Sequence, residues 1–137
     1  MRLALPFAVA LAALTLVPGA ALATAGMVCD GLGDVDASVE MNLPRSAGSP
    51  PNWVRVAAGG KSYSSLSIDE GAIPVATRQS FDDGDTFRID LTDESHDDAT
   101  IRIRLFRAEE GDAMPVYVGY LHVLGEDVYP IMCTEDE

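Results

Sequence analysis

The chain has 137 residues, and its 22 Asp and Glu residues outnumber its 9 Lys and Arg residues to give a formal net charge of −13. Such a charge repels nucleic acid and anionic membrane surfaces, so neither is expected as a partner. It attracts cations and basic proteins. A basic protein is therefore the partner class that the net charge favours.

Residues 1–23 have the pattern of a secretory signal peptide. Arg2 precedes an apolar run over residues 3–17, and small residues at 21–23 and 23–25 form two A-x-A cleavage sites. We therefore expect cleavage after residue 23 or as late as residue 25. The apolar run is too short for a stable membrane span, so no membrane insertion is expected once the signal has been removed.

Residues 26–137 have a length that suits a single domain. The compact signal peptide and the Ala- and Asp-rich, Lys-poor composition indicate a bacterial protein of the periplasm or the medium. Two cysteines, Cys29 and Cys133, remain in a compartment that permits oxidation. They predict a disulfide between the first and last strands, worth roughly 4–5 kcal/mol in the chain-entropy model.

Apolar residues alternate with polar ones through most of the mature chain, and this period of two is typical of half-buried strands. Residues 72–80 are ambiguous, because Pro74 restricts them to an edge strand or an irregular segment. The sequence therefore predicts an all-β fold, a single small antiparallel sandwich or barrel of about seven or eight strands that ends in a meander. The predicted strands are residues 35–43, 52–58, 86–91, 100–106, 116–124 and 128–133, with a weaker strand over 61–68.

Seven Asp and one Glu crowd around His96 between residues 82 and 98. If residue 91 pairs with 101 and 89 with 103, Asp90 lies opposite Arg102, and the other carboxylates become turn or loop residues. The spacing of an EF-hand is absent. We therefore predict no metal-ligating residue, although a metal- or calcium-binding protein that uses the acidic loops remains an alternative.

Motifs for catalysis are absent from the sequence. There is no G-x-S-x-G elbow, and both cysteines are predicted to be oxidised. The run from Gly60 to Ser62 ends like a P-loop, but Arg55 stands where that motif needs its first Gly. Neither His96 nor His122 has a partner recognisable from sequence. We therefore predict that the protein is not an enzyme and has neither catalytic residues nor a cofactor.

The segment Gly60, Lys61, Ser62, Tyr63 is the predicted partner-binding loop. Glycines let a loop protrude, the only Lys of the chain lies here, and Tyr is a preferred interface anchor. Gly60 and Tyr63 resemble the G-x-x-Y part of the S-G-x-x-Y loop of periplasmic lysozyme inhibitors, with Gly59 in place of the Ser. That resemblance implies insertion of the loop into the active cleft of a lysozyme.

The function that we predict is that of an exported, non-catalytic protein, a binding or interaction module of the bacterial envelope. The alternative drawn from the resemblance is an inhibitor of a lysozyme-type cell-wall hydrolase that uses the loop from Gly60 to Tyr63. The sequence predicts neither the identity of the partner nor the oligomeric state, and it leaves the choice between sandwich and barrel open.

Overall fold

A computed structural model describes residues 24–46, 48–95 and 98–136 of the protein. The predicted signal peptide, residues 1–23, lies outside this part of the chain, and so does His96. The described residues contain no helix, so the predicted all-β class is confirmed. It follows that none of these residues belongs to a helix long and apolar enough to cross a membrane.

One sheet contains all ten strands of the described residues. Its spatial order is β5-β4-β3-β2-β1-β10-β9-β8-β7-β6, and all neighbours are antiparallel except β4 and β5. The strands are β1 (Ala25–Gly31), β2 (Ala37–Leu43), β3 (Trp53–Ala58), β4 (Lys61–Ser64), β5 (Ile73–Pro74), β6 (Ala76–Asp82), β7 (Thr86–Thr92), β8 (Ala99–Ala108), β9 (Val116–Val123) and β10 (Val128–Asp136).

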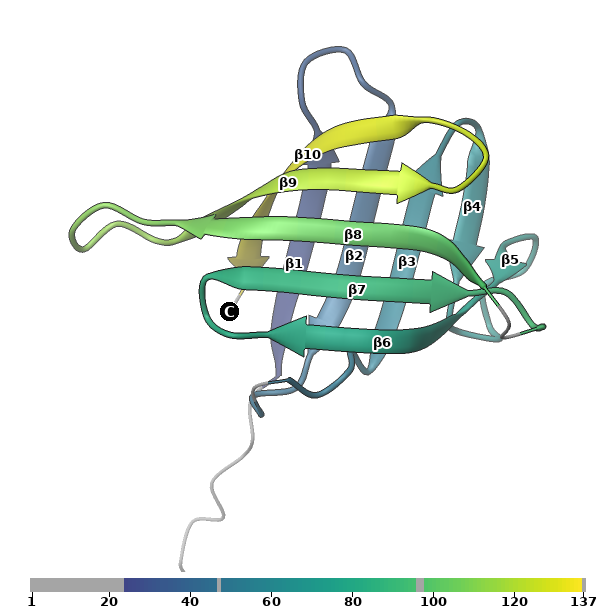
Figure 1. Cartoon of the computed structure of the whole chain (residues 1–137), viewed down its shortest axis with the longest axis horizontal. Coiled ribbons are helices and arrows are strands. Elements are labelled where there is room, and N and C mark those ends of the chain that lie inside the picture. The colour runs from purple at the N-terminus through teal and green to yellow at the C-terminus, as the bar shows by residue number, and fades with distance from the viewer. Residues whose placement is uncertain (1–23, 47, 96–97, 137) are drawn as a thin grey trace, which may run out of the picture.

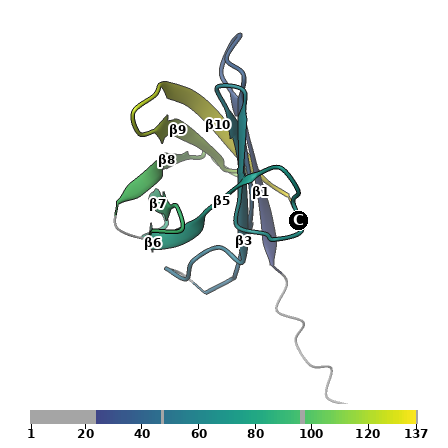
Figure 2. The same cartoon turned by 90° about the vertical axis from the view of Figure 1, so that its right-hand side faces the viewer.

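The sheet folds over on itself and nearly closes into a barrel. In Figure 1, β6 to β9 form a front layer that crosses β1 to β4 behind it. Figure 2 shows the two layers from the side, and β10 runs from the front layer to the back layer. Residues 128–134 of β10 pair with β9 and residues 131–136 pair with β1, so this one strand belongs to both layers.

The core lies between the two layers, where the inward residues of each strand meet. The predicted inward faces of β7 and β8 are confirmed, because Ile89, Leu91, Ile101, Ile103 and Leu105 are all fully buried. The predicted register is also confirmed, with Leu91 opposite Ile101 and Ile89 opposite Ile103. Burial of such side chains contributes roughly 1.5–3 kcal/mol each, so this alternation is the main source of stability.

Cys29 of β1 and Cys133 of β10 lie directly opposite each other in the core. Their sulfur atoms are 2.05 Å apart, and the bond spans a sequence separation of 104 residues. It therefore joins the first strand to the last at the seam where the sheet folds over, as the sequence predicts. A disulfide is compatible with an oxidising compartment.

Two segments differ from the expected strands. The ambiguous residues 72–80 fall in two strands. β5 is only two residues long, and β6 begins after the buried Val75. The expected strand over residues 61–68 ends at Ser64. The hydroxyl of Ser65 accepts the Val54 amide at 2.9 Å and that of Ser64 accepts the Leu66 amide at 3.0 Å, and the chain turns out of the sheet there.

Gly119 allows β8 and β9 to approach each other closely. A Cβ atom at this position would lie 1.9 Å from the carbonyl oxygen of Arg104. Any larger residue would therefore push β8 and β9 of the front layer apart.

Candidate functional site

The predicted partner-binding loop is the tight turn between β3 and β4. Ala58 pairs with Lys61, so Gly59 and Gly60 alone make the turn, and their φ angles of 58° and 73° favour glycine. In this two-residue turn Val56 pairs with Tyr63. Cross-strand partners share a face, so Tyr63 points the same way as the buried Val56.

Tyr63 is only 4% exposed and belongs to the core. Burial raises the pKa of its phenol. The loop therefore does not present Tyr63 to a partner, in contrast to what the resemblance to lysozyme inhibitors implies. The reason is the register: the short turn places Tyr63 opposite the buried Val56, on the inward face of the sheet.

The exposed part of the loop is engaged within the molecule. Lys61 forms an ion pair with Glu126 of the turn between β9 and β10, and this contact raises the pKa of the lysine. A Cβ atom at Gly59 would lie 2.9 Å from the Tyr129 hydroxyl, so the two turns are also in close contact. The loop joins two hairpin ends, and we find no protruding anchor in it.

The acidic stretch forms turns, as its sequence predicts. Asp82 Oδ1 accepts the Gly84 amide at 2.9 Å, and Asp83 Oδ1 accepts the amides of Asp85 at 3.1 Å and Thr86 at 2.7 Å. These bonds lower the pKa of Asp83, with the Thr86 amide as the largest cause. Carboxylates used in this way shape the hairpin between β6 and β7.

No group of three or more His, Cys, Asp or Glu that could hold a metal ion occurs within the described ranges. His96 and Asp97 lie outside those ranges. His122 lies on the outward face of β9 with Val118 and Tyr120, and its cross-strand neighbours are Arg102 and Val128.

A groove of about 620 Å³ lies on the outward face of β2, β3 and β4. Its floor consists of small side chains such as Ser38, Ala57 and Ser62, and its wall is the segment over residues 68–72, which folds back over the sheet. Ile68 lies on the rim and is 78% exposed.

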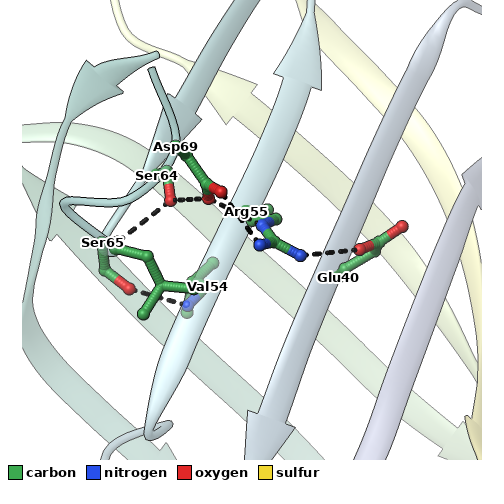
Figure 3. A network of polar contacts seen from close by, with 7 residues as sticks. Glu40, Val54, Arg55, Ser64, Ser65 and Asp69 are labelled. Carbon is green, nitrogen blue, oxygen red and sulfur yellow. Dashed lines mark hydrogen bonds and ion pairs between the residues drawn. The ribbon is translucent and has the colours of Figure 1, made fainter. Parts of the chain in front are cut away.

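An ion-pair network fixes the wall of the groove to its floor (Figure 3). Arg55 donates from Nε to Asp69 Oδ2 at 2.7 Å and from Nη2 to Asp69 Oδ1 at 2.9 Å. Ser64 donates to Asp69 Oδ2 at 2.5 Å, and Arg55 also lies 3.9 Å from Glu40. The Arg55 guanidinium, and then the Ser64 hydroxyl, lower the pKa of the Asp69 carboxyl.

The described lining of the groove contains no Ser–His or Cys–His pair. Ser64 is buried and donates its proton to Asp69, and the described lining residues include no His or Cys that could serve as a base or nucleophile. Arg55 is held in a bidentate pair and is not available to an anionic ligand. The arrangement fixes a loop to the sheet.

The outward face of the front layer is different. The register aligns the outward residues of β7, β8, β9 and β10 in three rows across the strands. We call this set of side chains the outer patch, and its rows are Asp90, Arg102, His122, Val128; Arg88, Arg104, Tyr120, Pro130; and Thr86, Phe106, Val118, Met132.

Exposed apolar side chains gather in the outer patch. Ten large apolar side chains of the described residues are exposed; five of them belong to the patch, and Phe81 lies beside it. Phe106 is 58% exposed and Val128 is 56% exposed. Figure 1 shows this face of β7 to β9 toward the viewer, with no described element in front of it. Patches of this kind mark contact surfaces more often than single exposed residues do.

The charge of the outer patch is opposite to that of the chain. Arg104 donates from Nη2 to Asp90 at 2.6 Å and from Nη1 to two backbone carbonyls, so the only carboxylate of the patch is neutralised. Within the described residues, Arg88 and Arg102 have no ion-pair partner, and Arg88 stacks over the Phe81 ring at 5.6 Å. The patch itself thus has more Arg than Asp on a protein of net charge −13, although Asp83 interacts electrostatically with Arg88 and Asp30 lies opposite Met132 at the edge of the patch.

The reasoning from sequence missed this surface, although one signal of it was present. The segment over residues 116–123, VYVGYLHV, has apolar residues at both odd and even positions, whereas a half-solvated strand alternates. A strand that is apolar on both faces needs a cover on each side. The core covers one face of β9, and nothing in the described chain covers the other.

None of the three comparisons with known proteins relates the chain to another protein: no protein-family model, no curated protein and no solved structure matches it.

Proposed function

We propose that this protein is an exported, non-catalytic binding module of the bacterial envelope, and that the outer patch is the surface with which it binds its partner. The observation that carries the proposal is the gathering of Phe106, Val118, Tyr120, Val128 and Met132 on one sheet face. Covering exposed apolar area that is gathered on one face lowers the free energy of the complex.

Two further observations support a binding role rather than a catalytic one. The described lining of the groove includes no His or Cys, and the strongest polar network, around Asp69, has its groups satisfied within the molecule. The disulfide and the signal-like residues 1–23 support an oxidising compartment such as the periplasm. The alternative of a lysozyme inhibitor is less well supported, because the Tyr63 side chain that would enter the cleft of the enzyme is buried.

The test is copurification of envelope proteins with the tagged protein from the cell that produces it. The variant Phe106→Ser/Met132→Ser removes exposed apolar area from the patch, and Ile68→Ser/Ile73→Ser removes it from the groove side. We expect a specific partner to bind wild type and the groove-side control but not the patch variant. Equal recovery with both variants, each shown to be folded, contradicts the proposal.

A further inference from the structure

We infer that the partner of the outer patch is an acidic protein surface that places a carboxylate beside Arg88 and Arg102 and an apolar area over β9 and β10. This inference rests on the proposed function and adds the chemistry of the partner. It runs against the expectation from net charge, which favours a basic protein. The local charge of the contact surface decides which partner fits, since screening limits distant charges to about 8 Å at physiological salt.

The patch is divided into a basic half and an apolar half. Arg88, Arg102 and Arg104 come from β7 and β8, whereas Val118, Tyr120, Val128, Pro130 and Met132 come from β9 and β10. Phe106 lies at the boundary, opposite Val118. A partner that fits must therefore bring carboxylates to one side of its contact area and apolar side chains to the other.

Two arginines of the patch can receive those carboxylates, and one of them, Arg88, already interacts electrostatically with Asp83 of the hairpin between β6 and β7. Arg104 is already bound to Asp90, but Arg88 and Arg102 have no ion-pair partner among the described residues. Arg88 is held in place by its stacking on Phe81, so less side-chain freedom is lost when it binds. A guanidinium of this kind favours a planar carboxylate, which it can bind through two hydrogen bonds.

A depression beside Arg88 has room for a side chain of the partner. It has a volume of about 230 Å³, and Gln79, Phe81, Arg88, Asp90 and Arg104 line it. This is below the roughly 300–1,000 Å³ of sites that take free small molecules, so it suits one side chain of a larger surface. The amide of Gln79 and the ring of Phe81 give that side chain both polar and apolar contacts.

Three other occupants fit less well. A second copy of this chain, docked patch to patch, would bring unpaired arginines together on two molecules that each carry −13. An anionic polysaccharide would leave Val128 and Met132 without apolar partners. An anionic membrane would be repelled by the rest of the chain, and the patch lies on the strands of the front layer rather than on a protruding loop.

The test is site-specific photo-cross-linking from position 120, at the centre of the patch. A photoreactive phenylalanine analogue replaces Tyr120 in otherwise wild-type protein and in the backgrounds Arg88→Glu, Arg88→Lys and Arg45→Glu, all produced in the native cell. Arg45 is an exposed loop residue, so R45E is a matched control for the charge change of R88E. Thermal unfolding checks that each variant is folded.

We expect a protease-sensitive adduct whose yield falls about tenfold in R88E, and largely survives in R88K and R45E. Mass spectrometry should map the adduct to a partner segment that contains Asp or Glu. An adduct that resists protease, or one that R88E leaves unchanged, overturns this inference and leaves the binding function intact. No adduct in any background contradicts the proposed function itself.

Discussion

The groove over β2 to β4 and the outer patch of β7 to β10 are outward faces of the same sheet, yet they differ in how their polar groups are used. In the groove, Arg55 is held by both carboxylate oxygens of Asp69, and Ser64 completes the network. In the patch, Arg88 and Arg102 have no ion-pair partner among the described residues, and apolar side chains are exposed on the neighbouring strands β9 and β10.

This difference shows that the larger hollow is not the better candidate for a binding surface. A polar network whose members satisfy one another gains little from a ligand, because a ligand would have to replace bonds that already exist. Exposed apolar area and unpaired guanidinium groups gain contacts when a partner arrives. We therefore propose a structural role for the groove and a binding role for the patch.

The largest expected change in the free energy of unfolding comes from the inward face of β9, and a substitution on its outward face should change it little. Leu121→Ala removes a fully buried side chain and should lower the free energy of unfolding by about 2–5 kcal/mol. Tyr120→Ala, on the outward face of the same strand, should cost no more than about 0.5 kcal/mol. Urea denaturation measures both, and similar costs would mean that the outer patch is covered in the free protein.

The disulfide should come next in size, because it joins β1 of the groove layer to β10 of the patch. Cys29→Ala/Cys133→Ala should lower the free energy of unfolding by about 2–4 kcal/mol, because the unfolded chain is no longer constrained and measured losses often fall short of the chain-entropy value. Partner binding should persist at temperatures where the variant is folded. Denaturation of the variant beside oxidised wild type tests this, and an unchanged stability would contradict a structural role for the bond.

The network at Asp69 should have a smaller effect, and one that depends on pH. The pKa of Asp69 is lowered in the folded state, so its contribution is full above the unfolded value of about 3.9 and is lost as pH falls through the folded pKa. Asp69→Asn should therefore melt at a lower temperature than wild type at pH 7, and the difference should shrink below about pH 4. A difference that is independent of pH would contradict the charged pair with Arg55.

The outer patch itself should contribute least to stability. Phe106→Ser/Met132→Ser should change the free energy of unfolding by no more than about 0.5 kcal/mol per site, and the binding of a hydrophobic dye should fall. Ile68→Ser, at the rim of the groove, serves as the control. If the patch variant loses several kcal/mol, these side chains are part of the core, and the contrast between the regions fails.

Much of the fold follows from the sequence because a half-buried strand records its inward face at every second residue. The alternation in residues 86–91 and 100–106 gives the buried side chains and the register of β7 against β8. The two cysteines give the bond between the first and last strands. These features depend on local pattern and on pairing between chain neighbours, which a sequence displays.

The position of Tyr63 could also have been derived from the sequence. A two-residue Gly59-Gly60 turn makes Ala58 and Lys61 partners and therefore puts Tyr63 on the face of Val56. The contact of Lys61 with Glu126, by contrast, joins hairpins 65 residues apart. Such a contact depends on how the sheet folds over, and no local pattern records it.

The outer patch is also a product of strand order. Its basic half comes from β7 and β8 and its apolar half from β9 and β10, and the three rows exist only because these strands are neighbours in the predicted meander. The sequence predicts the meander itself. What the sequence does not display is that nothing in the described chain packs on its outward face.

The most direct test of the central claim compares the two regions in one experiment. A photoreactive residue is placed at Val118 in the patch and, in a separate protein, at Ser62 on the floor of the groove, and both proteins are irradiated in the cell that produces them. We predict a defined adduct from position 118 and none above background from position 62. An adduct from position 62 alone, or equal adducts from both positions, would contradict the assignment of the binding surface to the outer patch.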